Sequence, residues 1–166
     1  MRVIGLDPGV ALTGFAVVEK APSGPRAAAI GVIKTPAGAP QESRLLMLRR
    51  ELAGVLERHA PDAMAIERVF FNANTKTAMA VGQASGVALV TAAEFDLDVT
   101  DYTPTEVKQA IVGIGNASKQ QVQAMVAAVL GLEGAPRPAD AADAAALAIC
   151  HINRSGLKRA VGVATR

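Results

Sequence analysis

The first 34 residues alternate short apolar runs with turns that contain proline and glycine. Residues 3–6 form an apolar run that stops at a turn, 7–9, and residues 13–19 resume the strand pattern. A second turn at 21–25 leads into a third strand at 27–34. Consecutive strands joined by short turns pair in antiparallel fashion, so the chain is expected to begin with three antiparallel strands.

Helices and strands alternate along the rest of the chain. Apolar residues recur at three- and four-residue steps in 42–59, as in an amphipathic helix. Strands are expected at 63–66 and 97–102, with a long helix between them at 77–93. Three more helices are expected after these elements. Capping-box patterns predict one helix that begins at Pro104 and another that follows Ser118 and ends at about Leu132. A Pro-Arg-Pro segment precedes the third, which runs from Ala139 to about Ser155.

This order predicts an α/β fold with a five-stranded mixed sheet, three antiparallel strands plus two parallel ones, and helices on both faces. We expect a single domain at 1–156 and a basic, flexible tail at 157–166. Hydrophobic residues make up 51% of the chain but aromatic residues only 3%. The core must therefore be packed mainly with alanine, valine, leucine and isoleucine.

The charge and cysteine content restrict the class of protein. The net charge of +2 permits a polyanionic partner without requiring one. The single cysteine, Cys150, excludes an internal disulfide and disfavours a cysteine-based zinc site. The first residues carry a charge too early for the pattern of a signal peptide, so none is expected there. The longest uncharged stretch, 77–93, predicts a buried helix and not a membrane span. We expect a cytoplasmic protein.

Two carboxylates directly follow apolar strands. Asp7 comes after the strand 3–6 and Glu67 after the strand 63–66. Taken alone, Asp7 could cap a turn and Glu67 could be a strand end that reaches solvent. Adjacent parallel strands would place both side chains at the same edge of the sheet, within reach of one ion.

Asp140 and Asp143 are three residues apart, so they lie on one face of a helix and in its first turn. Capping of a helix N-terminus, where the macrodipole favours negative charge, is one explanation for them. The rest of this helix is rich in alanine, however, so it can lie tightly on the sheet. Asp140 and Asp143 would then point to the edge that carries Asp7 and Glu67.

Four clustered carboxylates repel one another and need a countercharge. Hard divalent cations with oxygen ligands fit best, and Mg²⁺ suits a shell completed by water and phosphate. Two such ions can activate a water molecule and stabilise the leaving oxygen of an in-line displacement. The residues therefore predict a metal-dependent nuclease that hydrolyses phosphodiester bonds.

Several segments resemble the RuvC-type Holliday-junction resolvases of the ribonuclease-H-like superfamily. The resemblance lies in ordered blocks from Arg2 to about Asn153, namely IGLDPG with TG at 4–14, AIERVF at 65–70, GQASG at 82–86, VKQ with VGIG at 107–115, and ADAADA at 139–144. It implies a homodimeric endonuclease that cuts four-way DNA junctions by paired symmetric nicks in recombination and repair. It also implies that the four carboxylates bind Mg²⁺, for which Mn²⁺ can substitute, and that a branch-migration motor complex is a partner.

The resemblance further implies DNA contacts. Phe70 matches an aromatic residue next to the junction centre, where it can stack on an unpaired base. Phe71 could be the residue that packs inward. Lys108 and Lys119 match lysines implicated in contacts to DNA and phosphate, and Lys119 also lies at a helix N-terminus that favours anions. Arg68 and Lys76 could add phosphate contacts, although their spacing does not distinguish them.

Gly82 and Gly86 lie one above the other on the helix 77–93 and would permit another backbone to approach closely. That backbone could belong to the sheet beneath or to a second subunit, and the resemblance favours the second subunit for part of the helix.

Three other functions stay open on sequence alone. One is a different ribonuclease-H-like nuclease, such as one that processes RNA. A second is an actin-type ATPase lobe, for which the chain is too short. A third is a junction-binding protein without catalysis, which would have no reason to keep four carboxylates.

Overall fold

The computed structural model describes residues 1–68 and 75–164, except for the side chains of 75–77 and 156–164. A five-stranded sheet has the order β3-β2-β1-β4-β5. The first three strands are antiparallel neighbours, whereas β1 pairs in parallel with β4, and β4 with β5. The mixed sheet predicted from the sequence is confirmed, with strands β1 (Arg2–Asp7), β2 (Leu12–Ala21), β3 (Gly24–Lys34), β4 (Ala63–Glu67) and β5 (Asp98–Tyr102).

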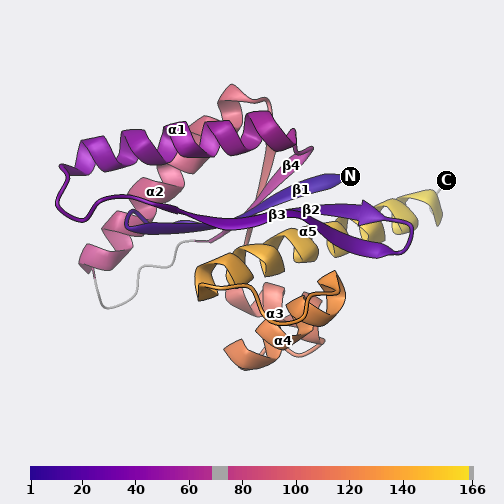
Figure 1. Ribbon diagram of the computed structural model, residues 1–166. Helices are drawn as coiled ribbons and strands as arrows, with labels where there is room; N and C mark the ends of the chain where they lie inside the picture. Colours follow the sequence, from indigo (N-terminus) through magenta and orange to yellow (C-terminus); the bar gives the residue numbers. More distant parts are fainter. Residues whose placement is uncertain (69–74, 165–166) are drawn as a thin grey trace.

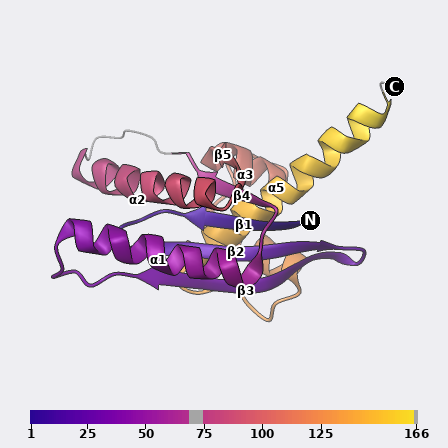
Figure 2. The same cartoon turned by 90° about the horizontal axis from the view of Figure 1, so that it is seen from above.

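Helices cover both faces of the sheet (Figure 1). One face carries α1 (Gln41–His59) and α2 (Thr75–Glu94), and the other carries α3 (Pro104–Val112), α4 (Lys119–Leu130) and α5 (Ala139–Ala164). In the view from above, α1 and α2 run side by side along the sheet (Figure 2). In β1, Ile4 and Leu6 face the α1–α2 layer while Val3 faces α5, which is the two-residue alternation of a strand buried on both sides.

Two helices begin as the capping-box patterns predicted. The Thr103 hydroxyl accepts from the Glu106 amide while the Glu106 carboxylate accepts from the Thr103 amide, and Ser118 and Gln121 repeat this exchange at α4. These paired bonds satisfy backbone donors that a helix start leaves free. They therefore set where α3 and α4 begin.

Two helix ends differ from the predicted positions. Gly131 adopts a left-handed conformation, with φ of 64°, and ends α4 at Leu130, two residues before the approximate end predicted at Leu132. In the other direction, α5 continues past the expected end at Ser155 to Ala164. No helix-breaking proline stands between those positions, so the helical backbone can propagate. The flexibility of the tail at 157–166 stays a prediction.

The backbone of α5 lies directly against the sheet at two glycines. A Cβ atom on Gly5 of β1 would overlap the carbonyl oxygen of Ala144, and one on Gly14 of β2 would overlap that of Asp140. The facing side of α5 is made of alanines that are almost fully buried, among them Ala141, Ala144 and Ala148. The sheet and α5 can therefore approach more closely than larger side chains on either element would allow.

Gly14→Ala should lower both stability and any activity of the site near Asp140, because the helix must move away from the sheet. Overpacking of this kind typically costs about 1–3 kcal/mol in free energy of unfolding, which urea denaturation measures. Gly54→Ala in α1 is the matched control, since a Cβ there meets nothing within 4 Å. Alanine should stabilise that helix slightly. Equal stability of the two variants would contradict the close approach.

Candidate active site

Asp7 and Glu67 lie beside each other at one edge of the sheet. Leu6 of β1 pairs with Ile66 of β4 in parallel register, so the residues that follow them leave the sheet together. Their carboxyl groups interact directly, because the charge of Glu67 and a side-chain hydrogen bond between the two groups are among the causes that raise the pKa of Asp7. The prediction that adjacent strand ends bring these two residues together is confirmed.

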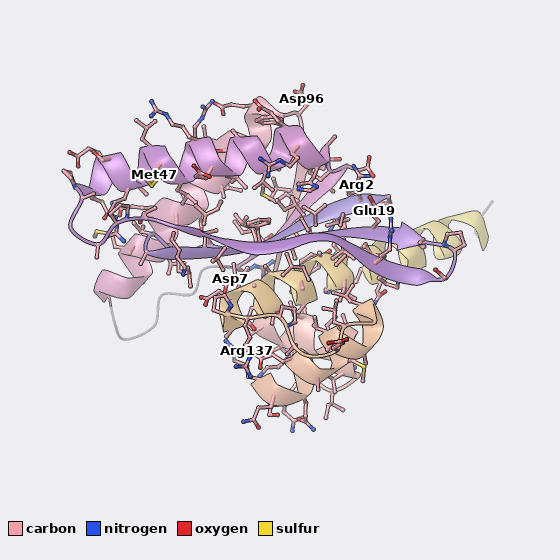
Figure 3. All side chains as sticks on the ribbon, viewed as in Figure 1. Arg2, Asp7, Glu19, Met47, Asp96 and Arg137 are labelled. Carbon is pink, nitrogen blue, oxygen red and sulfur yellow. The ribbon has the colours of Figure 1, made fainter. Side chains whose placement is uncertain are left out.

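The first turns of α5 add Asp140 and Asp143 to the same place. Gly14, the cross-strand partner of Asp7, is the residue on which the Asp140 backbone packs. Both aspartates lie close enough to raise the pKa of Asp7 by charge repulsion. Figure 3 shows Asp7 where the sheet meets the start of α5. Three elements, β1, β4 and α5, therefore converge on one acidic cluster, defined here as Asp7, Glu67, Asp140 and Asp143.

Burial and mutual repulsion perturb this acidic cluster strongly. Burial is the largest cause that raises the pKa of Asp7, to about 7, and the negative charges of Glu67, Asp143 and Asp140 raise it further. Burial also raises the pKa of Glu67, while the hydrogen bond from Asp7 opposes that rise. Protonation of Asp7 thus relieves part of the repulsion among the carboxylates.

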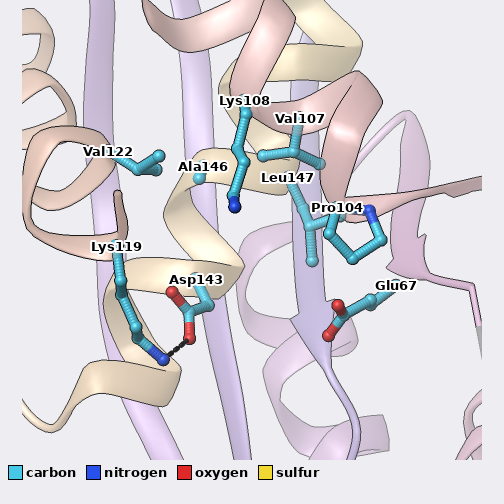
Figure 4. A pocket seen from close by; sticks show the side chains of 9 residues that line it. All are labelled: Glu67, Pro104, Val107, Lys108, Lys119, Val122, Asp143, Ala146 and Leu147. Atoms are coloured by element: carbon cyan, nitrogen blue, oxygen red, sulfur yellow. Dashed lines mark hydrogen bonds and ion pairs between the residues drawn. The ribbon is translucent and has the colours of Figure 1, made fainter. Parts of the chain in front are cut away.

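Lys119 supplies positive charge to the acidic cluster. Its ammonium donates a hydrogen bond to Asp143 Oδ2 at 2.5 Å, across the space between α4 and α5 (Figure 4). This bond is the main cause that raises the pKa of Lys119, and the charges of Asp7 and Asp140 add to it. Lys119 is the first residue of α4, so the helix N-terminus adds its favourable potential for anions.

The acidic cluster suits a hard divalent cation by its chemistry. All of its donors are carboxylate oxygens, and the proton on Asp7 marks a site where positive charge is favourable. Among the described residues, no group of three His, Cys, Asp or Glu side chains already surrounds a single point. Asp143 points to Lys119 and Asp7 to Glu67, so these side chains must turn before they act together as ligands.

The other predicted contact residues divide into three groups. Lys108 of α3 and Lys119 line one pocket together with Glu67 and Asp143. Arg68 instead forms an ion pair with Asp101 at the edge strand β5, where both side chains are about half exposed. Phe70 and the side chain of Lys76 lie outside the described residues.

Apolar residues around the pocket were missed in the sequence. Pro104 and Val107 of α3, Val122 of α4, and Ala146 and Leu147 of α5 line it beside the charged groups. In the sequence these residues match ordinary helical core positions, and nothing in their spacing distinguishes them. His151, to which no role was given, lies 3.0 Å from the Tyr102 hydroxyl through its Nδ1 atom, behind α3.

Asp7→Asn should stabilise the protein at neutral pH in the presence of a chelator. The pKa of Asp7 rises from 3.8 to about 7 on folding, so its contribution to stability is present below pH 3.8 and is lost as pH rises through about 7. The asparagine side chain of the variant does not ionise, so the variant does not lose this stability as pH rises. The full rise in pKa corresponds to about 4 kcal/mol, and solvent screening of the partly exposed Asp7 reduces this to about 2 kcal/mol. Scanning calorimetry from pH 4 to 8 should show the advantage of the variant grow from near zero to that value, or about 4–8 °C in Tm.

The control for this measurement is Asp98→Asn, at an exposed aspartate at the start of β5. Its Tm should follow the wild-type protein at every pH. A Tm advantage of Asp7→Asn that stayed constant across the pH range would show that the acidic cluster carries no such repulsion.

Comparison with known proteins identifies the family. The family model described as crossover junction endodeoxyribonuclease RuvC matches residues 3–151. A protein of that name from Moorella thermoacetica is 50% identical over 151 residues, which cover 91% of this chain and 90% of the relative. One from Leifsonia xyli subsp. xyli is 52% identical over 158 residues, 95% of this chain and 76% of the relative.

Solved structures agree with this assignment. Thermus thermophilus RuvC in complex with a Holliday junction substrate superposes with a TM-score of 0.90 at 38% identity, covering 95% of this chain and 96% of that one. The yeast mitochondrial Holliday junction resolvase Ydc2 shares the fold with a TM-score of 0.69 at 16% identity, over 95% of this chain and 82% of that one. The ribonuclease-H-like architecture is thus confirmed, and the chain belongs to the RuvC family of crossover junction endodeoxyribonucleases.

Proposed function

We propose that this protein is a structure-specific endonuclease that resolves four-way DNA junctions by paired symmetric nicks, in recombination and repair. The observation that carries the proposal is the acidic cluster, where Asp7, Glu67, Asp140 and Asp143 meet at one edge of the sheet. The solved relative bound to a Holliday junction supports the choice of substrate. A junction-binding protein without catalysis would gain nothing from four carboxylates that repel phosphate.

The acidic cluster would hold two Mg²⁺ ions, for which Mn²⁺ may substitute. When bound, such ions activate a water molecule and stabilise the leaving oxygen of phosphodiester hydrolysis. Asp7 must be ionised to bind these ions, so activity at limiting Mg²⁺ should increase as pH rises toward neutrality. Asp143 must likewise break its ion pair with Lys119 before it can bind the metal.

Lysines beside the acidic cluster would bind the DNA backbone. Lys119 is free for a phosphate once Asp143 turns away, and its position at the start of α4 adds the helix dipole. Lys108 enters the same pocket from α3. Phe70, Arg68 and Lys76 follow Glu67 in the chain and are proposed to contact the junction, with Phe70 stacking on an unpaired base.

We infer that the protein acts as a homodimer through α2. Met79, Leu89 and Val90 are 66%, 47% and 60% exposed, and they lie on one face of α2 with Gly82 and Gly86. A Cβ on either glycine meets nothing within 4 Å, so neither is needed for packing on the sheet. The buried Ser85 hydroxyl has no hydrogen-bond partner in the described part of the chain. A second copy of α2 would cover this stripe and match the two-fold symmetry of a junction.

Two further assignments follow from the proposed activity. A junction-binding branch-migration motor is the proposed partner, since a resolvase acts on junctions that such motors move. The cytoplasm is the proposed location. Within the described part of the chain, every helix is too short or too polar to cross a membrane.

Asp7→Asn should abolish cleavage and retain junction binding. Loss of one ligand from the acidic cluster should slow cleavage by about 10³-fold, by analogy with the loss of one stabilising group in other active sites. Binding should stay equal or become tighter, because one negative charge near the phosphates is removed. Single-turnover cleavage of a synthetic four-way junction over a Mg²⁺ titration, with gel-shift binding in Ca²⁺, measures both.

Asp98→Asn is again the control and should cut at the wild-type rate. Retained cleavage by Asp7→Asn would remove Asp7 from the active site. Linear duplex and structured RNA are assayed in parallel with the junction. Equal wild-type rates on all three would exclude junction resolution and favour a general ribonuclease-H-like nuclease.

Leu89→Glu should separate the dimer into monomers, because a carboxylate would be buried against the other copy of α2. Sedimentation velocity measures the mass. Leu46→Glu on α1 is the matched control, since Leu46 is 49% exposed and Leu89 is 47% exposed. The control should remain dimeric. If Leu89→Glu also stays dimeric, the interface lies elsewhere.

A further inference from the structure

A buried polar contact joins β5 to α5 behind the acidic cluster. The Tyr102 hydroxyl lies 3.0 Å from Nδ1 of His151, and the two rings meet edge to face with their centroids 6.0 Å apart. Tyr102 is 4% exposed and His151 is 8% exposed, so bulk water does not compete for this contact. Burial raises the pKa of Tyr102 to about 12, so the hydroxyl keeps its proton at neutral pH and can donate it to a hydrogen bond.

Both partners of this contact are connected to the acidic cluster through the backbone. The Tyr102 carbonyl accepts a hydrogen bond of 2.9 Å from the amide of Arg68, and Tyr102 pairs with Glu67 in the parallel register of β4 and β5. His151 lies on α5, the same helix as Asp143, about 12 Å farther along the axis at 1.5 Å per residue. The contact between Tyr102 and His151 therefore links the Glu67 side of the acidic cluster to the side on α5.

The Tyr102 ring is also held from the other side, where α3 begins. The Arg154 guanidinium of α5 lies 5.5 Å from the centroid of the ring and donates a hydrogen bond of 2.9 Å to Glu106 Oε1. The second oxygen of Glu106 accepts from the amide and the hydroxyl of Thr103, the residue that follows Tyr102. In the view from above, β5, α3 and α5 lie together at this place (Figure 2). These contacts restrict how the ring can turn away from His151.

α5 needs a directional contact because its face toward the sheet is nearly uniform. Small, similar side chains such as Ala141, Ala144 and Ala148 set how closely the helix approaches the sheet. Such uniform packing specifies the position along and around the helix axis less well than packing of varied shape. A buried hydrogen bond depends on both distance and direction, so it favours one arrangement of the two elements.

We propose that Tyr102 and His151 are positioning residues for metal binding, which fix where α5 places Asp140 and Asp143 relative to Glu67. Neither residue touches the metal or the DNA, and both act through the carboxylates. This inference rests on the proposed metal-dependent cleavage and adds two residues to its machinery. Loss of a group that orients metal ligands typically weakens metal binding by about 10–100-fold, and this more remote contact should lie near the lower end of that range.

Tyr102→Phe tests the proposal because it removes the hydroxyl and keeps the ring. The dissociation constant for Mn²⁺, measured without DNA from the electron paramagnetic resonance signal of the free ion, should increase by about tenfold. The Mg²⁺ concentration that gives half of the maximal single-turnover rate should increase by the same factor. The rate at saturating Mg²⁺ and the junction affinity at saturating Ca²⁺ should stay at the wild-type values, because the carboxylates themselves are intact.

Thr91→Val is the control for loss of a buried hydroxyl. Thr91 is fully buried on the opposite face of the sheet and donates only to the carbonyl of Val87 within α2. This variant should bind Mn²⁺ as the wild-type protein does. Wild-type Mn²⁺ affinity in Tyr102→Phe would overturn the positioning role. If the wild-type protein itself bound no Mn²⁺, the proposed function would fail instead.

A double variant separates positioning from stability. Tyr102→Phe removes a partner of His151 and should lower Tm, whereas Tyr102→Phe combined with His151→Leu replaces both partners by apolar groups and should recover much of that loss. Mn²⁺ binding should nevertheless stay weak in the double variant. His151→Gln keeps an acceptor for the Tyr102 hydroxyl and should bind Mn²⁺ more tightly than His151→Leu. Recovery of Mn²⁺ affinity together with Tm in the double variant, or equal affinities of the two His151 variants, would show a purely structural role.

Discussion

Close packing of α5 on the sheet is the contact on which the site depends. Gly5 and Gly14 leave the space that the α5 backbone occupies, and the alanines of α5 leave the matching space on the helix. This contact places Asp140 over the residue that pairs with Asp7. A helix held farther out by larger side chains would separate Asp140 and Asp143 from the two strand ends.

The same contact brings the carboxylates of the acidic cluster close together, where they repel one another. Bringing four carboxylates together raises the pKa of Asp7 and leaves Asp143 paired with Lys119. The proton on Asp7 and the ammonium of Lys119 are both positive charges that a divalent cation can replace. In the proposed function, the acidic cluster gives up local stability in exchange for affinity for metal, as functional sites often do.

Much of the fold could be predicted because its signals are local. Short apolar runs bounded by turn residues marked the strands, and the capping boxes at Thr103 and Ser118 marked two helix starts. Helix ends were harder to predict, since Gly131 ends α4 at Leu130 and α5 continues beyond Ser155. The acidic cluster was predictable because parallel strands end at the same edge.

The sequence by itself determined the order of elements, the strand ends that carry Asp7 and Glu67, and the helical face that carries Asp140 and Asp143. Those features follow from apolar runs and from helical spacing within single segments. Only the tertiary structure decided the ion pair between Lys119 and Asp143 and the pocket between α3, α4 and α5. Both depend on how separate helices pack on the sheet. A local sequence pattern does not indicate the distance between segments that are far apart in the chain.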